Sequence, residues 1–100
     1  MRFRRFRGGI KLAMIDIIGR PAMLEQMAEE ASELAKAALK LARIERGENP
    51  TPVTKEEAEK NLTEEYTDVI QCAIELQLQA DIMQMHRKYE RFKKRIEGGN

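Results

Sequence analysis

Residues 21–46 read PAMLEQMAEEASELAKAALKLARIER, and their pattern is the strongest structural signal in the chain. Apolar side chains recur there at intervals of three and four, which is typical of an amphipathic helix with one buried stripe. Pro21 suits the first turn of such a helix, where a missing backbone N–H costs nothing. The pattern therefore predicts a helix from Pro21 to about Arg46, with the core stripe Met27, Ala31, Leu34, Ala38 and Leu41.

A second helix is predicted after residues 47–52, where Gly and Pro interrupt the pattern and indicate a loop. Thr54 and Glu57 have the spacing of a capping box, in which the two side chains satisfy unpaired amides at a helix start. The expected core stripe repeats the three-four spacing and consists of Leu62, Tyr66, Val69, Ala73 and Leu76.

The region after Leu76 leaves two interpretations open, because no Gly or Pro interrupts the chain from Thr54 to Gly98. One helix could run unbroken to Ile96, as a rod of roughly 65 Å. We favour a turn near Gln79 to Asp81, with Asp81 as the N-cap of a third helix, because folding back covers more apolar surface in a short chain. The apolar stripe of this third helix is Ile82, Met85, Tyr89, Phe92 and Ile96.

The composition agrees with an all-α fold. A chain of 100 residues forms one small domain, and 35% charged with 5% aromatic residues favours helices over a strand-rich sandwich. We expect an antiparallel helical bundle of three to four helices over residues 10–97, between a basic tail at 1–9 and a flexible end at 98–100. Surplus apolar residues on the second helix, Ile70, Ile74 and Leu78, favour completion by homo-oligomerisation into a homodimer or homotetramer.

Charge and cysteine content narrow the class of protein further. Net charge is +5 over residues 1–20, −7 over 21–80 and +3 over 81–100, so an acidic centre lies between basic ends. The single Cys72 excludes an intrachain disulfide, and no apolar stretch is long enough to span a bilayer. The apolar stretch at 10–18 contains Lys11 and Asp16 and has no cleavage site, so we reject export and expect a cytoplasmic protein without a membrane partner.

The acidic centre contains two matched pairs of carboxylates. Helical periodicity places Gln26, Glu30 and Glu33 along one flank of the first helix, and Asn61, Glu65 and Asp68 along one flank of the second. The short loop between the helices favours antiparallel neighbours, in which the two pairs could meet. Clustered carboxylates repel each other unless a cation neutralises them, and Mg²⁺ prefers oxygen ligands completed by substrate phosphates. Solvated surface charge is the alternative interpretation of such stripes.

Two segments, QMAEEASEL at 26–34 and EYTDV at 65–69, carry a family resemblance. Together they resemble the EExxE…ExxD signature of MazG-like all-α nucleoside triphosphate pyrophosphohydrolases, over about residues 19–76. The resemblance implies hydrolysis of a nucleoside triphosphate to the monophosphate and pyrophosphate, in nucleotide-pool housekeeping. It also implies Mg²⁺, with Mn²⁺ as an alternative, and it implies Glu30, Glu33, Glu65 and Asp68 as metal ligands, with Glu29 or Glu33 positioning the attacking water.

Several other side chains are candidates for binding the substrate. Lys40 lies nearly on the face of Glu33, where relatives of this family often have a lysine, and it could pair with a phosphate. Cations near the C-terminus could close over the triphosphate, although such residues also complement a helix dipole. The predicted substrate-binding set is Gln26, Lys40, Asn61, Arg91, Lys94 and Arg95.

Three residues or segments receive structural interpretations. His86 has a packing or surface role, Cys72 is a buried thiol, and the arginine-rich tail docks in an oligomer or is disordered more readily than it binds nucleic acid. A non-catalytic helical interaction or regulatory protein remains the alternative function. A phosphoribosyl-ATP pyrophosphohydrolase-like enzyme is the second alternative.

Overall fold

The computed structural model describes residues 4–5, 11–48 and 52–98, and most of these residues are helical. The four helices are α1 (Met14–Ile18), α2 (Arg20–Glu45), α3 (Lys55–Glu75) and α4 (Ile82–Glu97). Two-residue strands β1 (Arg4–Arg5) and β2 (Lys11–Leu12) pair antiparallel, with Arg4 opposite Leu12. The sequence did not predict this pairing, but it is too short to alter the all-α class.

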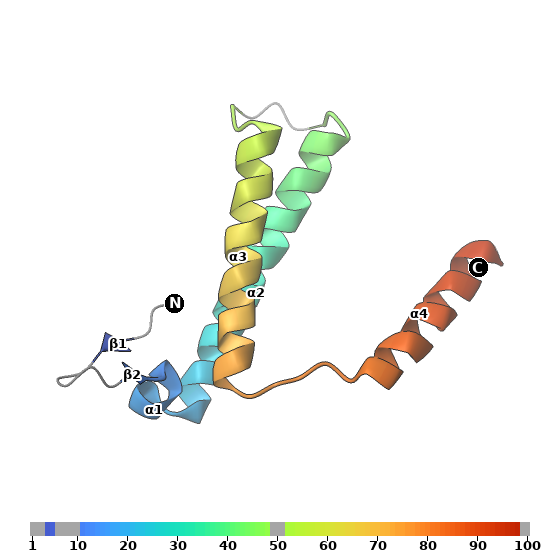
Figure 1. The fold of residues 1–100 in the computed structure, drawn as a ribbon. Coiled ribbons are helices and arrows are strands. Elements are labelled where there is room, and N and C mark those ends of the chain that lie inside the picture. Colours follow the sequence, from blue (N-terminus) through green and yellow to red (C-terminus); the bar gives the residue numbers. More distant parts are fainter. Residues whose placement is uncertain (1–3, 6–10, 49–51, 99–100) are drawn as a thin grey trace.

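The centre of the fold is an antiparallel hairpin of α2 and α3, which lie side by side along most of their length (Figure 1). Pro21 occupies the first turn of α2, as predicted. The Thr54 hydroxyl accepts a hydrogen bond from the Glu57 amide at 3.1 Å and donates one to the Glu57 carboxylate. The predicted cap of the second helix is therefore confirmed, and an ion pair between Lys55 and Glu45 joins the two helix ends.

The start of α2 is set by Gly19, whose φ of 87° separates α1 from α2. Left-handed backbone of this kind favours glycine because a Cβ strains it. The reversal lays α1 against the lower end of the hairpin, where Met14 and Ile15 pack on the core of Met23, Cys72 and Leu76.

The predicted core stripes are partly wrong in their orientation. Ala31 and Ala38 of α2 are exposed, and Tyr66 of α3 is 56% exposed, although all three were expected inside. The buried positions Met23, Ala37, Ala58 and Cys72 show that each helix is rotated toward its acidic stripe. Small side chains explain the rotation, since Ala37 and Ala58 let the two backbones approach closely.

The break before the last helix is confirmed, with α3 ending at Glu75 and α4 beginning at Ile82. The Asp81 carboxylate accepts a hydrogen bond from the Gln84 amide at 3.0 Å, which is the predicted cap. The expectation that this helix folds back is not met within the chain, because α4 extends away from the hairpin (Figure 1). The four described helices agree with the predicted all-α class and helix number, but within one chain the helix packing joins α1, α2 and α3, and completion of the bundle by homo-oligomerisation stays a prediction.

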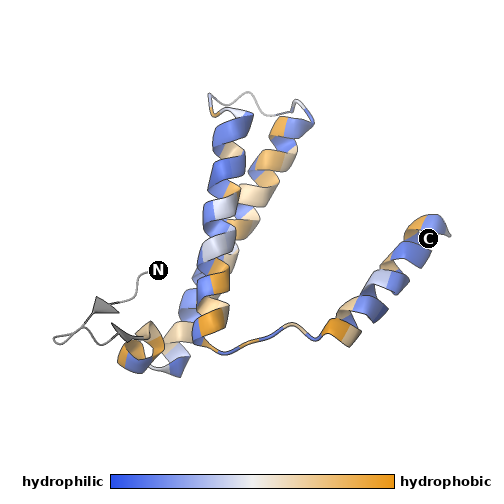
Figure 2. Cartoon of the chain, viewed as in Figure 1, coloured by the Kyte–Doolittle hydropathy of each residue, from blue (hydrophilic) through white to orange (hydrophobic). Residues whose placement is uncertain are grey.

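Hydropathy follows the same division. Figure 2 shows apolar residues in α1, along α2 up to its far end and in the lower part of α3, while α4 alternates between apolar and polar residues. Among the described residues, no helix combines the length and the apolar character needed to cross a membrane.

Candidate functional site

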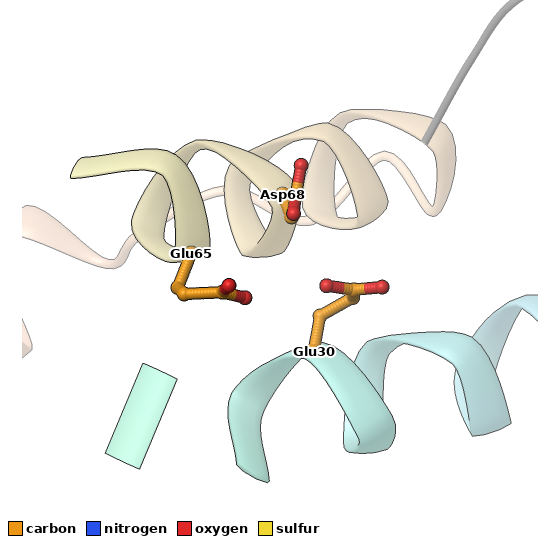
Figure 3. A group of neighbouring side chains, drawn as sticks. All are labelled: Glu30, Glu65 and Asp68. Carbon is orange, nitrogen blue, oxygen red and sulfur yellow. The ribbon is translucent and has the colours of Figure 1, made fainter. Parts of the chain in front are cut away.

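Three of the four predicted carboxylate ligands meet between α2 and α3. Glu30 extends from α2 toward Glu65 and Asp68 of α3 (Figure 3). One carboxylate oxygen from each of the three residues lies within 4.8 Å of the others, and all three side chains are half-buried. We call these three residues the carboxylate cluster.

The rotation of both helices toward their acidic stripes produces this cluster. Glu65 and Asp68 are three residues apart and so project from neighbouring positions on one side of α3. Glu30 stands opposite them, one helical turn from Glu33 and two turns from the buried Ala37. Packing of small residues therefore brings acidic side chains into the helix interface, where solvent screens them less than on an open surface.

Glu65 experiences the strongest electrostatic effect in the cluster. Partial burial between the helices raises the pKa of the Glu65 carboxyl, and the negative charge of Asp68 raises it further. Glu30, Glu33 and Glu64 act in the same direction. A carboxyl group surrounded in this way gains when a proton or a cation arrives, so the donor set suits a hard divalent ion with oxygen ligands.

A side-chain amide also contacts the cluster. The Gln26 Nε2 group donates a hydrogen bond to Glu30 Oε1 at 2.8 Å, one turn before it on α2. This bond restricts the rotation of the Glu30 carboxylate and leaves its second oxygen for another partner. Gln26 was predicted to bind substrate, and its observed contact is with a carboxylate of the cluster.

The other acidic candidates lie outside the cluster. Glu33 is exposed and pairs with Lys36 at 3.5 Å, although it is near enough to influence Glu65 electrostatically. Glu29 is exposed one position away from Glu30 and lines an open depression of about 550 Å³ with Ala28, Glu30, Ser32 and Glu33. A second open depression, of about 600 Å³, reaches Asp68 from the side of Lys60 and Thr63. The two depressions border the cluster on its two helices.

The predicted cationic and amide contacts are spread more widely. Lys40 is half-buried on α2, ten residues beyond Glu30, and Asn61 is exposed one turn before Glu65 on α3. Arg91, Lys94 and Arg95 lie on α4, which the chain holds away from the hairpin (Figure 1). Within one chain, these three residues are not gathered at the carboxylate cluster.

Cys72 and Glu75 continue α3 beyond the cluster and have structural contacts. The Cys72 thiol is buried, as predicted, and burial together with the Glu30 charge raises its pKa, so it is a poor nucleophile. Glu75 is also buried, and its Oε1 accepts a hydrogen bond from the Ile15 amide at 2.7 Å. This contact was not predicted from the sequence, where its signal is an acidic residue beside Leu76 at the apolar end of α3.

Comparisons with known proteins assign no family to the chain. No protein-family model matches the chain, and neither the curated proteins nor the solved structures gave a match. The geometry of the carboxylate cluster and the sequence motifs are therefore the observations on which a functional proposal rests.

Proposed function

We propose that the protein is a Mg²⁺-dependent nucleoside triphosphate pyrophosphohydrolase, with Mn²⁺ as an alternative metal. The observation that supports this most is the convergence of Glu30, Glu65 and Asp68, which comes from the two half-motifs of the EExxE…ExxD pattern. The reaction is attack of water on the α-phosphorus, with cleavage of the α–β anhydride bond. Its products are a nucleoside monophosphate and pyrophosphate.

The roles of the residues follow from their positions. Glu30, Glu65 and Asp68 would hold the ion, with Glu33 completing the set after release of Lys36. Bound there, Mg²⁺ would supply charge neutralisation for the triphosphate and for the leaving pyrophosphate. Gln26 orients Glu30, and either Glu29 or Glu33 holds the water and accepts its proton. The two open depressions beside the cluster leave room for a substrate to approach from solvent.

Substrate contacts complete the proposal. Lys40 and Asn61 would contact the substrate from α2 and α3, and Arg91, Lys94 and Arg95 would reach the phosphates from a neighbouring copy in a homodimer or homotetramer. Carboxylates in the absence of a metal repel a triphosphate, so binding of the nucleotide should require the ion. Removing divalent ions with a chelator should abolish both binding and turnover.

The test is a product assay on a panel of ribo- and deoxynucleoside triphosphates and phosphoribosyl-ATP, with Mg²⁺. We expect equal release of monophosphate and pyrophosphate, without diphosphate and inorganic phosphate. The variants Glu30→Gln, Glu65→Gln and Asp68→Asn should each lower kcat by about a hundredfold or more. Glu64→Gln is the matched control, since it lies next to Glu65 but outside the cluster, and it should retain activity.

Two results would refute the enzymatic proposal. One is the absence of pyrophosphate release from every nucleotide in the panel. The other is release that is unchanged in the double variant Glu33→Gln with Asp68→Asn. Titration of Mn²⁺ into the protein, followed by electron paramagnetic resonance, tests cation binding separately from turnover.

A non-catalytic interaction protein is the second candidate, and one observation favours it. The apolar stripe of α4 is exposed along its whole length, with Ile82 70% and Ile96 65% exposed. A helix of this kind binds a partner whether or not the hairpin has a catalytic site. Absence of hydrolysis together with strong self-association through α4 would favour this candidate.

A further inference from the structure

Helix α4 is well formed, yet it has no buried residue among those that the structure describes. Every described side chain of α4 is exposed except that of Glu90, which is half-buried. Met85, Tyr89 and Phe92 are between 55% and 59% exposed, in register along one stripe. Monomeric proteins rarely expose a continuous apolar stripe of this length, so a partner is expected to cover it.

The hairpin has an uncovered surface of its own. At about 100° per residue, Leu24, Ala31 and Ala38 lie roughly 80–120° from the buried face of α2. By the same count, Tyr66 and Ala73 lie roughly 80–100° from the buried face of α3, and Ile70 lies about 140° from it. Because α2 and α3 are antiparallel, both sets fall on the same side of the hairpin. We call these six residues the apolar face. Leu24 is 41% exposed and Tyr66 is 56% exposed.

The carboxylate cluster does not use the apolar face. Asp68 and Glu33 lie on the other side of the buried faces of their helices, by the same periodicity. The apolar face is therefore available for packing while the cluster stays open to solvent.

Helix α4 and the hairpin as a whole have net charges of opposite sign. Helix α4 carries six basic and two acidic residues, a net charge of +4. Helices α2 and α3 together carry six basic and twelve acidic residues, a net charge of −6. Lys88, Lys93 and Arg95 flank the apolar stripe of α4, so they would lie at the rim of an interface with the hairpin and favour the correct encounter.

The size of the exposed surface also favours a partner. The accessible area of the chain is 8228 Å², whereas a compact monomer of this mass exposes about 5,800 Å². The radius of gyration is 18.0 Å, against about 13 Å for a compact domain of this length. The excess is about 2,400 Å² per copy, and burying half of it in each of two copies reaches the range of stable homodimer interfaces, about 2,000 Å² and above.

The junction between α3 and α4 directs α4 away from its own hairpin. Gln77, two residues beyond the end of α3, has a φ of 57°, and the Leu78 amide donates a hydrogen bond to the Ala73 carbonyl at 2.9 Å. Residues 78–81 then form an extended connection that can span about 14 Å. This exit is visible in Figure 1, where α4 points outward from the base of α3.

We propose that α4 of one copy packs on the apolar face of a second copy, which returns its own α4 to the first. A symmetric exchange of this kind covers both surfaces with one element that the chain already has. It does not depend on the enzymatic proposal, because no residue of the carboxylate cluster takes part. The exchange holds Arg91, Lys94 and Arg95 on the side of the hairpin away from the cluster, so under the enzymatic proposal these cations would have to come from a further copy in a homotetramer.

The first experiment measures the molar mass of the full-length chain by light scattering during size-exclusion chromatography. Wild-type protein should elute with twice the 11.6 kDa mass of the chain. Phe92→Glu places a charge in the apolar stripe and should weaken the dimer about a hundredfold, so that monomer dominates. The matched control Gln84→Glu adds the same residue on the polar side of α4 and should remain dimeric.

The second experiment identifies which copy receives α4. In a Cys72→Ala background, ¹⁵N-labelled chains with Ile70→Cys are mixed with unlabelled chains with Phe92→Cys and oxidised. Each chain then has one cysteine, so a disulfide between positions 70 and 92 can form only between copies, and mass spectrometry should find labelled and unlabelled peptides joined. Circular dichroism checks that the cysteine variants keep their helices.

Three outcomes would overturn the proposal. Wild-type protein could be monomeric at tens of micromolar, which would leave α4 for a different partner. The Phe92→Glu variant could remain a dimer, which would place the interface elsewhere. A chain carrying both Ile70→Cys and Phe92→Cys could form its disulfide internally as a monomer, which would show that α4 folds back on its own hairpin.

Discussion

The hairpin of α2 and α3 and the isolated helix α4 are built from the same local signals, yet they differ in what covers them. Both α3 and α4 begin at a side-chain cap, Thr54 and Asp81 respectively. Only α3 has buried residues on its surface, whereas α4 has none. Capping and apolar periodicity therefore set where a helix forms, but packing against another surface decides how much that helix contributes to stability.

The sharpest test of this difference is truncation in the core of the hairpin. Met23 is fully buried against Cys72 and Leu76, so Met23→Ala should lower the free energy of unfolding by about 2–4 kcal/mol. Leu39→Ala, at a residue of the same helix that is 60% exposed, should change it by less than about 1 kcal/mol. Urea denaturation at one fixed protein concentration measures both. Equal losses would show that the core is not centred on Met23.

The next largest effect should come from the contact that holds α1 to the hairpin. Glu75→Ala removes the acceptor of the Ile15 amide and should cost about 1–3 kcal/mol, because a half-buried N–H is left without its partner. Glu75→Gln keeps an acceptor oxygen and should cost less. Hydrogen exchange at the Ile15 amide should accelerate in the Ala variant. If exchange does not change, the contact does not restrain α1.

The hairpin and α4 also show which features of the fold were predictable from the sequence. Helix positions and caps were predictable because Thr54, Asp81 and Pro21 act on amides within a few residues. The orientation of the helices was not predictable, since Ala31 and Ala38 have the spacing of core residues, whereas the buried alanines are Ala37 and Ala58. Whether the predicted apolar stripe or the neighbouring acidic stripe faces the other helix depends on the shape of that helix. The local periodicity of one helix carries no information about this shape.

The candidate site was likewise predictable only in part. The i, i+3 spacing of Glu65 and Asp68 was enough to place them together, and the short loop between helices brought Glu30 opposite them. Glu33 has the same spacing from Glu30 but points to solvent and pairs with Lys36. Glu30 and Glu33 are one turn apart on α2, and a helical wheel cannot tell which of them faces α3 while the contact face is unknown.

Removal of the N-cap side chains of α3 and α4 should have effects of intermediate size, and these effects should differ between the hairpin and α4. Thr54→Ala should lower the free energy of unfolding of the whole hairpin by about 1 kcal/mol, because α3 is packed and its loss is shared. Asp81→Ala should speed hydrogen exchange in the first turn of α4 and leave the exchange of the α2 and α3 amides unchanged. Faster exchange throughout the hairpin in Asp81→Ala would mean that α4 shares the stability of α2 and α3.

The smallest expected effect on the free energy of unfolding comes from the Glu65 carboxylate between α2 and α3. Burial and the neighbouring carboxylates raise the pKa of Glu65 above its ordinary value of 4.5, so the folded protein holds the proton more tightly than the unfolded chain. Stability of the metal-free protein should therefore increase as pH falls through the raised pKa. Above it, Glu65→Gln should be more stable than wild type, and this gain should vanish below pH 4.5.

A control variant and added Mg²⁺ test whether the carboxylates of the cluster act as metal ligands. Glu64→Gln, one residue away and outside the cluster, should show a smaller dependence on pH. Under the enzymatic proposal, Mg²⁺ at neutral pH should raise the melting temperature of wild type more than that of Glu65→Gln, which reverses their order. A gain from Glu65→Gln that Mg²⁺ does not reverse would mean that the carboxylates repel each other without serving as ligands. The half-buried acidic residues would then set a limit on the stability of the hairpin and would no longer support a metal site.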